Sequence, residues 1–330
     1  MLCLPETQTW EKVKQTGLDY QVLNLNSTNP LELGLVYQRL KKILACFQPD
    51  VVNCHRGEGF IFLGLLARKF GFKLIRTRGD QRLPKKNVFN LWLHQKVASA
   101  VIATNSRMYN YFLTSFGLDP AKVHLVLGGI DRREFYPCLA ERNRIRKKLG
   151  YSDTDVVLGL LGRFDRVKGQ KELIQAVSQL YHQCGLTQLR LLLIGFDTAL
   201  STGQIQDWLR QYRVEHLSTI TGRVEHPRPF INSLDLGVVA SLSSEAIIRA
   251  GLEIMACQVP LIATKVGVLP DLVPESGLVL PGDVEALASK IKQALDPEFR
   301  RSLLEQEQAL LPELSLENFV AKTLKIYGAG

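Results

Sequence analysis

The sequence lacks the features that mark secreted, zinc-binding and membrane-spanning proteins. Its six cysteines are scattered with no C-x-x-C pair, which fits reduced thiols in a cytosolic protein and argues against a disulfide framework or a zinc site. The longest apolar runs, VVLGLLG (156–162) and LRLLLIG (189–195), are far shorter than the roughly 20 residues that span a bilayer. Residues 1–10 show no basic segment followed by an apolar one, so no secretory signal is visible. We therefore expect a cytoplasmic protein.

The charge of the chain is unevenly distributed. Charged residues make up 22% and hydrophobic residues 46% of the 330, which is ordinary for a globular protein and excludes a disordered one. Residues 1–150 carry 24 basic and 11 acidic side chains, a net of +13, and residues 151–330 carry 17 and 21, a net of −4. A basic half joined to a mildly acidic half indicates different partners, with nucleic acid, anionic lipid or an acidic substrate as candidates for the basic half.

Short apolar strands alternate with longer amphipathic segments along the chain. Strands are expected at residues 20–25, 50–54, 73–77, 100–104 and 123–127, and again at 156–162, 189–195, 217–222, 236–241 and 259–264. Strands that alternate with helices in this way indicate parallel sheets built from right-handed crossovers. Two such series predict an α/β protein with two facing Rossmann-like domains and a ligand between them.

The boundary between the domains is expected within residues 128–150, where LGGIDRREFYP (127–137) leaves a strand and a highly charged helix follows. We place a basic N-terminal domain at residues 1–140 and a C-terminal domain at 141–312. Residues 313–330 are predicted to form a terminal helix that is capped by Ser315 and packs back towards the N-terminal domain.

The first motif with chemical content is GRFDRVKG (162–169), directly after a predicted strand. Arg163 and Lys168 lie on the loop between this strand and the next helix. Two cations beside the positive end of a helix predict a site for a diphosphate. Taken alone, the motif fits two solvated charges on a loop equally well.

The second motif is SSEAIIRAGLEIMA (243–256), which is predicted to be one helix. Glu245 would start this helix, and Glu253 would follow slightly more than two turns later on a similar face. Carboxylates so placed can accept hydrogen bonds from sugar and ribose hydroxyls. The backbone N–H groups of Ala246, Ile247 and Ile248 could bind phosphate oxygens. An ordinary amphipathic helix explains the pattern as well when it is taken alone.

Together, these motifs resemble those of the retaining nucleotide-sugar glycosyltransferases of family 4, which have the GT-B architecture of two facing Rossmann-like domains. That family pairs a G-R-x(4)-K-G loop with an E-x(7)-E element, and its interdomain segment N-G-V-D-x(3)-F-x-P is similar to LGGIDRREFYP. The resemblance extends from Asp50 onward and is strongest over residues 156–281. It implies transfer of a sugar from a nucleoside-diphosphate sugar, with retention at the anomeric carbon and with neither a metal nor another cofactor.

The resemblance also implies roles for individual residues. Arg163 and Lys168 would bind the donor diphosphate and stabilise it as it departs, Glu253 would bind the ribose, and Glu245 would lie near the donor sugar. The donor-binding set as a whole is Gly162, Arg163, Lys168, Gly222, Arg223, Glu245, Ala246, Ile247, Ile248 and Glu253. Within it, Gly222 and Arg223 fall where the family binds the nucleotide base. The catalytic candidates are Glu245, Arg163, Lys168 and His55, and no metal site is expected because no Asp-x-Asp with acidic neighbours is present.

Two strand ends of the first half carry the acceptor candidates. His55 and Arg56 follow one predicted strand, and Arg78 and Asp80 follow the next. The family often has a histidine at both positions, and only His55 matches here. A structural and a catalytic role both stay open for His55. Arginines at this edge predict an acceptor that carries phosphate or carboxylate, because a guanidinium binds such groups bidentately.

The segment KKNVFNLWLHQKV (85–97) is both basic and aromatic. As a helix it would combine one apolar face with flanking lysines, namely Phe89, Trp92 and Leu93 with Lys85, Lys86 and Lys96. Such a helix could rest on an anionic membrane and present a lipid-linked acceptor. A helix that packs on the core and has a solvated rim is the alternative.

The chain departs from the family pattern in two places. It begins at what looks like the second strand, so the first β–α unit with its Gly-rich loop is missing from the sequence. We expect a start upstream or a truncation, with a domain that has lost part of its donor site as the alternative. In addition, the family's G-F-G after the first glutamate is replaced by 246–248, AII, which changes how closely the backbone can approach the donor.

We therefore predict a glycosyltransferase that builds a cell-envelope polysaccharide or lipopolysaccharide-type glycan, at the inner face of the cytoplasmic membrane. Its partners would be a nucleotide-sugar donor and a glycan or lipid-linked acceptor. A nucleotide-sugar epimerase of similar fold and a non-catalytic sugar-nucleotide-binding paralogue are the alternatives. Nucleic acid is not expected as a partner, because no recognition motif accompanies the basic half.

Overall fold

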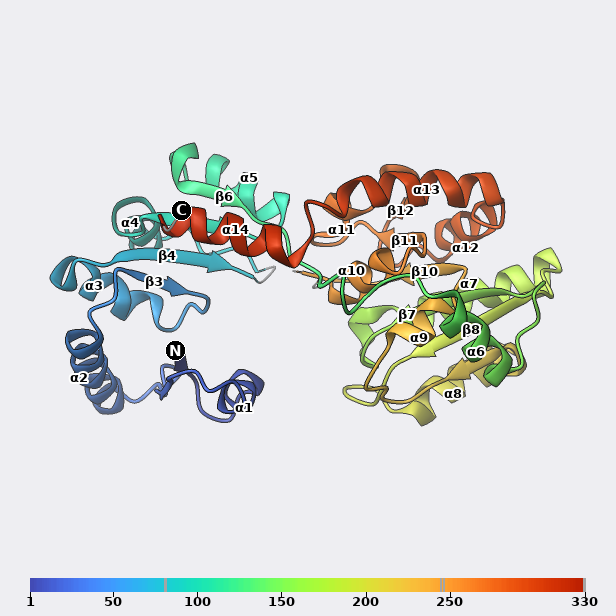
Figure 1. Ribbon diagram of the computed structural model, residues 1–330, viewed down its shortest axis with the longest axis horizontal. Coiled ribbons are helices and arrows are strands. Elements are labelled where there is room, and N and C mark those ends of the chain that lie inside the picture. The colour runs from blue at the N-terminus through green and yellow to red at the C-terminus, as the bar shows by residue number, and fades with distance from the viewer. Residues whose placement is uncertain (80–81, 244, 246, 329–330) are drawn as a thin grey trace.

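The computed structural model describes residues 1–79, 82–243, 245 and 247–328, which form two α/β domains side by side (Figure 1). Each domain contains a parallel sheet with helices around it. The predicted α/β class with two sheets is therefore confirmed. Within the described part of the chain, no helix is both long and apolar enough to cross a membrane.

The N-terminal domain is built on a four-stranded parallel sheet in the order β3-β4-β5-β6. Its strands are β3 (Val51–Cys54), β4 (Lys73–Arg78), β5 (Ala100–Ala103) and β6 (Val123–Leu125). The helices around it are α2 (Pro30–Phe47), α3 (Phe60–Phe70), α4 (Val88–Trp92), the π-helical turn η1 (Leu93–Val97) and α5 (Ser106–Thr114). Leu74 and Val101 point into one core, whereas Ile75 and Ile102 point into a second core on the opposite face. Burial on both faces explains why these strands are apolar throughout.

The first residues form a smaller unit beside this sheet. Strands β1 (Leu2–Cys3) and β2 (Gln21–Val22) are parallel and pair with each other on either side of α1 (Gln8–Lys14). In the described part of the chain, no hydrogen-bonded ladder joins this pair to β3. Leu2 and Leu23 nevertheless pack into the core that α2 and α3 share with the main sheet.

The C-terminal domain has a six-stranded parallel sheet in the order β12-β11-β10-β7-β8-β9. Its strands are β7 (Val156–Leu161), β8 (Leu189–Ile194), β9 (Ser218–Ile220), β10 (Leu236–Val239), β11 (Leu261–Thr264) and β12 (Leu278–Val279). The helices are α6 (Leu139–Leu149), α7 (Gln170–Cys184), α8 (Thr202–Gln211), α9 (Arg228–Asn232), α10 (Arg249–Ala256), α11 (Leu269–Leu272), α12 (Val284–Gln293) and α13 (Pro297–Leu310). From β7 the chain builds outward to β9 and then returns to build β10, β11 and β12 on the other side. The strand order therefore reverses between β7 and β10.

The last helix, α14 (Leu316–Tyr327), leaves the C-terminal domain and lies along the N-terminal domain (Figure 1). Ser315 caps it by accepting a hydrogen bond from the backbone N–H of Asn318 at 3.2 Å. Phe319 packs with Ile75 and its neighbours, and the side-chain amide of Asn53 donates a 2.6 Å hydrogen bond to the hydroxyl of Tyr327. The chain therefore crosses between the domains twice.

The segment 85–97 is not the single helix that its sequence predicts. The helix α4 ends at Trp92, and the π-helical turn η1 then shifts the register of the following side chains. Leu93 is fully buried in the core, whereas Phe89 is exposed and its ring lies 5.6 Å from that of Trp92. The prediction of one apolar face is therefore wrong for Leu93.

Candidate active site

The reversal of strand order in the C-terminal domain creates the crevice in which doubly wound sheets bind their ligands. Two loops leave the carboxyl ends of the strands that flank this reversal, one after β7 and one after β10. The first carries Arg163 and Lys168, and the second carries Ser241 and Glu245. The fold thus brings together two motifs that lie about 80 residues apart in the sequence.

An ion pair joins these two loops. The Lys168 ammonium donates to the Glu245 carboxylate across 2.6 Å, and the Ser241 hydroxyl donates to the same oxygen. Glu245 is only 3% exposed, and its backbone carbonyl also accepts a 2.9 Å hydrogen bond from the N–H of Val268. The carboxylate is therefore held from several sides, with its cation partner at the surface of the crevice.

The loop after β7 depends on glycine at one position. Gly169 has φ +71°, and a Cβ built there would lie 1.9 Å from the carbonyl oxygen of Ala240 just after β10. Only a residue without a side chain allows the start of α7 to approach the end of β10 this closely. Arg163, on the same loop, forms a 2.9 Å ion pair with Asp165 and remains half-exposed. Gly162, where the loop begins, has φ +155°.

The segment after Glu245 corrects the prediction of a helix over 243–256. The helix α10 begins only at Arg249, because Ile248 adopts the left-handed conformation at φ +41° and ψ 71°. The side chain of Ile248 is buried in the core, while Ile247 is exposed. Glu245, Ile247 and Ile248 therefore lie on a loop, and the N–H groups of Ile247 and Ile248 do not belong to a helical turn. Ala246 lies outside the described residues.

Glu253 lies on α10, in an apolar environment that opposes its ionisation. Burial raises the pKa of Glu253 to about 7, with the cation of Arg249 lowering it and the carboxylate of Glu134 raising it further. Since Glu245 is not helical, the predicted shared helix face of the two glutamates is wrong. A carboxyl group with such a pKa can change its charge near neutral pH.

The predicted base-binding positions follow β9. Gly222 has φ +72°, and the Arg223 guanidinium lies 4.3 Å from the centre of the Phe196 ring. Phe196 itself follows β8, so the pair joins two neighbouring strand ends. A cation stacked on an aromatic ring forms a flat surface on which a nucleotide base can stack.

The N-terminal domain presents the acceptor candidates at the carboxyl ends of β3 and β4. His55 is exposed, and partial desolvation together with the charge of Arg76 lowers the pKa of His55. Its imidazole is therefore neutral near pH 7. Arg56 is also exposed and pairs with Glu58 across 3.1 Å.

The two arginines of β4 are buried rather than free at the strand exit. Arg76 is 1% exposed and donates to the carbonyl oxygens of Cys54 at 2.7 Å and Thr77 at 3.0 Å. Arg78 is also buried, and its guanidinium donates to the carbonyl oxygen of Arg82. Both therefore brace the loops after β3 and β4, while Asp80 lies outside the described residues.

Two family models match the chain. The model described as "Glycosyltransferase Family 4" matches residues 12–134, and the model described as "Glycosyl transferases group 1" matches residues 155–297. The chain belongs to the family 4 glycosyltransferases. The resemblance seen in the motifs is thereby confirmed.

Relatives of this glycosyltransferase include two bacterial proteins. The "GDP-mannose-dependent monoacylated alpha-(1-6)-phosphatidylinositol monomannoside mannosyltransferase" of Corynebacterium glutamicum is 31% identical over 58% of this chain and 52% of its own length. The "Putative glycosyltransferase EpsD" of Bacillus subtilis is 26% identical over 89% of this chain and 80% of its own. The match to the corynebacterial relative thus spans about half of that protein.

Solved structures show the same fold at lower sequence identity. A glycosyltransferase from Rickettsia africae superposes with a TM-score of 0.84 at 19% identity, covering 99% of this chain and 89% of that chain. The Anabaena protein HepE, in complex with UDP, gives a TM-score of 0.84 at 18% identity, covering 98% and 91%. These likenesses confirm the predicted GT-B fold of the glycosyltransferase.

Several contacts around the crevice could not be predicted from the motifs of the sequence. Ser241 and Asp165 become relevant only through their contacts with Glu245 and Arg163. Phe196 is identified only by its contact with Arg223. His94 is buried among aromatic rings with its pKa lowered to about 4 by desolvation, so it is a core residue of the glycosyltransferase.

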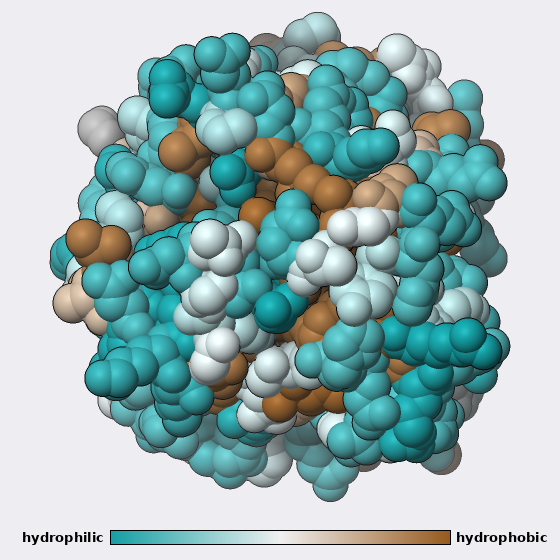
Figure 2. All heavy atoms as spheres, turned by 90° about the vertical axis from the view of Figure 1, so that its right-hand side faces the viewer, coloured by the Kyte–Doolittle hydropathy of each residue, from teal (hydrophilic) through white to brown (hydrophobic). Residues whose placement is uncertain are grey.

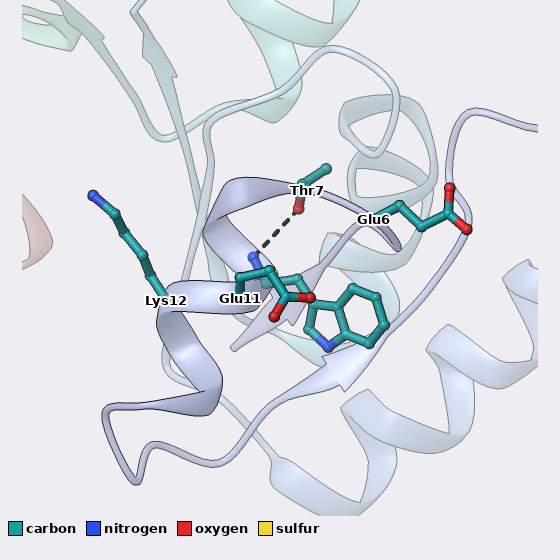
Figure 3. A pocket seen from close by; sticks show the side chains of 5 residues that line it. Glu6, Thr7, Glu11 and Lys12 are labelled. Carbon is teal, nitrogen blue, oxygen red and sulfur yellow. Dashed lines mark hydrogen bonds between the residues drawn. The ribbon is translucent and has the colours of Figure 1, made fainter. Parts of the chain in front are cut away.

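A separate cavity of about 500 Å³ lies around α1 and is lined by Glu6, Thr7, Trp10, Glu11 and Lys12 (Figure 3). Thr7 caps α1, and Lys12 points away from the two glutamates. None of the predicted donor residues that the structure describes lines this cavity. Among the described residues, no group of three or more His, Cys, Asp and Glu could hold a metal ion.

Proposed function

We propose that this glycosyltransferase moves a sugar, with retention of its anomeric configuration, from a nucleoside-diphosphate sugar to a glycan or lipid-linked acceptor of the cell envelope. The observation that carries the proposal is the contact of Lys168 with Glu245 where the strand order reverses. A lysine at that crevice is well suited to a diphosphate, and a carboxylate beside it is suited to sugar hydroxyls.

The donor would extend across the carboxyl edge of the sheet. The diphosphate would contact Lys168 and Arg163, and the ribose would contact Glu253. The base would lie near Gly222 and the cation–π pair of Arg223 with Phe196, in which the guanidinium lies 4.3 Å from the ring centre. HepE, which shares the fold, has been solved with UDP and with UDP-glucose, which supports a nucleotide sugar as the donor.

Retention follows in this proposal from attack on the face that the leaving group departs from. The bond between the anomeric carbon and the β-phosphate oxygen breaks while the acceptor oxygen bonds to the same face of that carbon. The acceptor proton passes to an oxygen of the leaving phosphate. Arg163 and Lys168 stabilise the negative charge that develops on the diphosphate, so the step as proposed needs no metal.

The acceptor would bind at the N-terminal domain. His55 is neutral near pH 7 and exposed at the end of β3, where it can orient an acceptor hydroxyl. Arg56 is exposed beside it and can bind an anionic group by exchanging its partner Glu58. The corynebacterial relative is named as a phosphatidylinositol monomannoside mannosyltransferase, which supports a lipid-linked or anionic acceptor here.

The test is release of nucleoside diphosphate from a panel of UDP-, GDP- and ADP-sugars, with and without acceptors extracted from bacterial envelopes. We expect turnover with one class of donor and its loss in Lys168→Ala. A matched control is Lys171→Ala, because Lys171 lies on α7 and faces the Trp208 ring at 5.9 Å. Formation of an epimerised sugar nucleotide without acceptor would contradict the proposal and favour an epimerase. Binding of the sugar nucleotide without release of nucleoside diphosphate in every condition would contradict it and favour a non-catalytic binding protein.

A further inference from the structure

A second cavity, of about 430 Å³, lies on the C-terminal domain between α7 and α12. Its wall comes from three segments that are far apart in the sequence, namely α7, the residue that follows α8, and the turn that leads into α12. The described residues that line it are Gln175, Ser178, Gln179, Tyr212, Gly282, Asp283, Val284 and Glu285. None of them belongs to the predicted donor or acceptor residues, so the proposed transfer leaves this cavity without a role.

Hydrogen bonds hold the wall of the cavity in place. The side-chain amide of Gln175 donates a 2.8 Å hydrogen bond to the hydroxyl of Tyr212. The Ser178 hydroxyl donates a 2.9 Å hydrogen bond to the backbone carbonyl oxygen of Tyr212. At the start of α12, the Asp283 carboxylate accepts a 2.9 Å hydrogen bond from the backbone N–H of Ala286. These side chains are therefore fixed before a ligand arrives, which lowers the entropic cost of binding.

Several polar groups of the lining keep hydrogen-bonding capacity for a ligand. The Tyr212 hydroxyl accepts from Gln175 and still has its own proton to donate. Asp283 caps α12 with one carboxylate oxygen, which leaves the other oxygen to accept. Gln179 offers an amide that both donates and accepts, and Glu285 offers an exposed carboxylate. The cavity therefore presents donors and acceptors side by side.

The charges of the lining restrict the class of ligand. Of the described residues that line the cavity, two are acidic and none is Lys, Arg or His. The C-terminal half of the chain, residues 151–330, also carries a net charge of −4. A phosphate or another anion would therefore meet repulsion and no cation. A cationic ligand would pair with the carboxylates but would leave the phenol and amide N–H groups of the wall unpaired.

A neutral sugar satisfies both kinds of group. Each sugar hydroxyl can donate to a carboxylate and accept from an amide or a phenol. The volume of about 430 Å³ falls within the range of small-ligand sites, about 300–1,000 Å³. Figure 2 views the C-terminal domain end-on and shows mostly hydrophilic residues, with hydrophobic areas that polar residues interrupt. A hydrophilic ligand suits such a domain surface better than an apolar partner does.

The cavity lies next to the donor crevice. A Cβ built at Gly282 would lie 3.9 Å from a methyl carbon of Leu242. The backbone N–H of Leu242 donates a 2.8 Å hydrogen bond to the carbonyl oxygen of Val167, on the loop after β7. Leu242 also directly follows Ser241, whose hydroxyl donates to Glu245. Leu242 therefore links the wall of the cavity to both donor loops.

We propose that the cavity between α7 and α12 is a second carbohydrate-binding site, which takes a neutral sugar unit of the glycan away from its reacting end. Sugar binding itself needs only this cavity. That the bound sugar belongs to the acceptor of the transfer rests on the proposed function. A glycan held here between transfers stays close to the crevice, which raises its effective concentration there.

The test is titration of the full chain with linear hexasaccharides of glucose, mannose and galactose, followed by saturation-transfer NMR in the absence of any donor. We expect at least one hexasaccharide to bind. The double variant Gln179→Ala with Tyr212→Phe should raise its Kd by about tenfold, because two hydrogen bonds to the sugar are lost. Both changes keep the ring at position 212 and the backbone of α7, and thermal unfolding verifies that the variant folds.

A matched control lies on the same helix. Gln183→Ala with Tyr181→Phe makes the same two changes outside the lining, because Gln183 is exposed and the Tyr181 ring packs on His182 and His216. This control should leave the Kd unchanged. Spermine and pyrophosphate are the cationic and anionic probes, and neither should displace the hexasaccharide.

Four results would overturn the proposal. They are no binding of any hexasaccharide, an equal Kd in the double variant and the wild type, an equal loss of affinity in the control, and displacement of the hexasaccharide by spermine or pyrophosphate.

Sugar binding at this cavity is measured independently of the transfer reaction. Hydrolysis of the free sugar nucleotide should be unchanged in Gln179→Ala with Tyr212→Phe, because neither residue lies at the donor crevice. Sugar binding in a chain without turnover would contradict the proposed function alone. Turnover in a chain that binds no hexasaccharide would contradict this second site alone.

Discussion

Removal of the Lys168 ammonium tests whether its ion pair with Glu245 holds the two donor loops together before a donor binds. The charged atoms lie 2.6 Å apart, and the side chain of Glu245 is 5% exposed against 21% for Lys168. At an effective dielectric constant of about 20, the direct attraction at this distance is about 6 kcal/mol. Desolvation of the two charges offsets much of this attraction, but removing one partner of a buried pair leaves the other charge uncompensated, which costs about 3–5 kcal/mol. We therefore expect Lys168→Ala to lower the free energy of unfolding by about 3 kcal/mol.

The assay is thermal unfolding near neutral pH, followed by circular dichroism. A loss of about 3 kcal/mol corresponds to a decrease of about 6–12 °C in the Tm of a domain of this size. The control is Lys265→Ala, because Lys265 pairs with Glu275 at the surface, where such a pair contributes less than about 1 kcal/mol. A Tm for Lys168→Ala as high as that of the control would refute the reasoning, since it would mean that Glu245 does not depend on its cation.

Three further changes have defined outcomes. Gly169→Ala should lower the Tm and abolish donor binding, because the new Cβ would lie 1.9 Å from a backbone oxygen. Gly185 has a similar φ of +67° with open space around it, so Gly185→Ala should lower the free energy of unfolding by only about 1 kcal/mol. Burial raises the pKa of Glu253 from 4.5 to about 7, so ionisation of Glu253 lowers the free energy of unfolding as pH rises from 4.5 through 7. Glu253→Gln should therefore raise the Tm at pH 8 but not at pH 4.5. Tyr327→Phe removes the hydroxyl that accepts the 2.6 Å hydrogen bond from Asn53 and should cost about 1 kcal/mol in chemical unfolding.

The sequence predicts five of the six strands of the C-terminal domain, most of which are buried on both faces and read as apolar runs, and it misses the two-residue strand β12. The apolar run of β7 also predicts correctly that the loop GRFDRVKG follows this strand. The rule that ligands bind where strand order reverses then predicts that this loop meets the segment after β10. Local pattern and topology thus suffice to find the crevice.

The sequence could not predict the start of α10. Residues 243–256 have a helical pattern, but Glu245 pairs with Lys168 from a distant part of the chain, and Ile248 is buried in a left-handed conformation. These tertiary contacts override local propensity. Leu93 shows a similar limit, since it is fully buried while Phe89, four residues earlier, is exposed, and helical spacing alone predicts one face for both.

The arginines of β4 show how burial changes a role. From the sequence, Arg78 at a strand end indicates an anion-binding side chain. In the structure, Arg76 and Arg78 are buried and donate to backbone carbonyl oxygens. Among the acceptor candidates, His55 and Arg56 are the exposed ones at β3.

The central claim is that Lys168 and Arg163 bind the diphosphate of a nucleotide sugar. The most direct measurement is calorimetric titration of UDP, GDP and ADP, each compared with its nucleoside, against the wild-type chain, Lys168→Ala and Lys265→Ala. We predict that one diphosphate binds far more tightly than its nucleoside, and that this difference collapses in Lys168→Ala but not in Lys265→Ala. An unchanged difference in Lys168→Ala, or no preference for any diphosphate over its nucleoside, would contradict the assignment of the donor site.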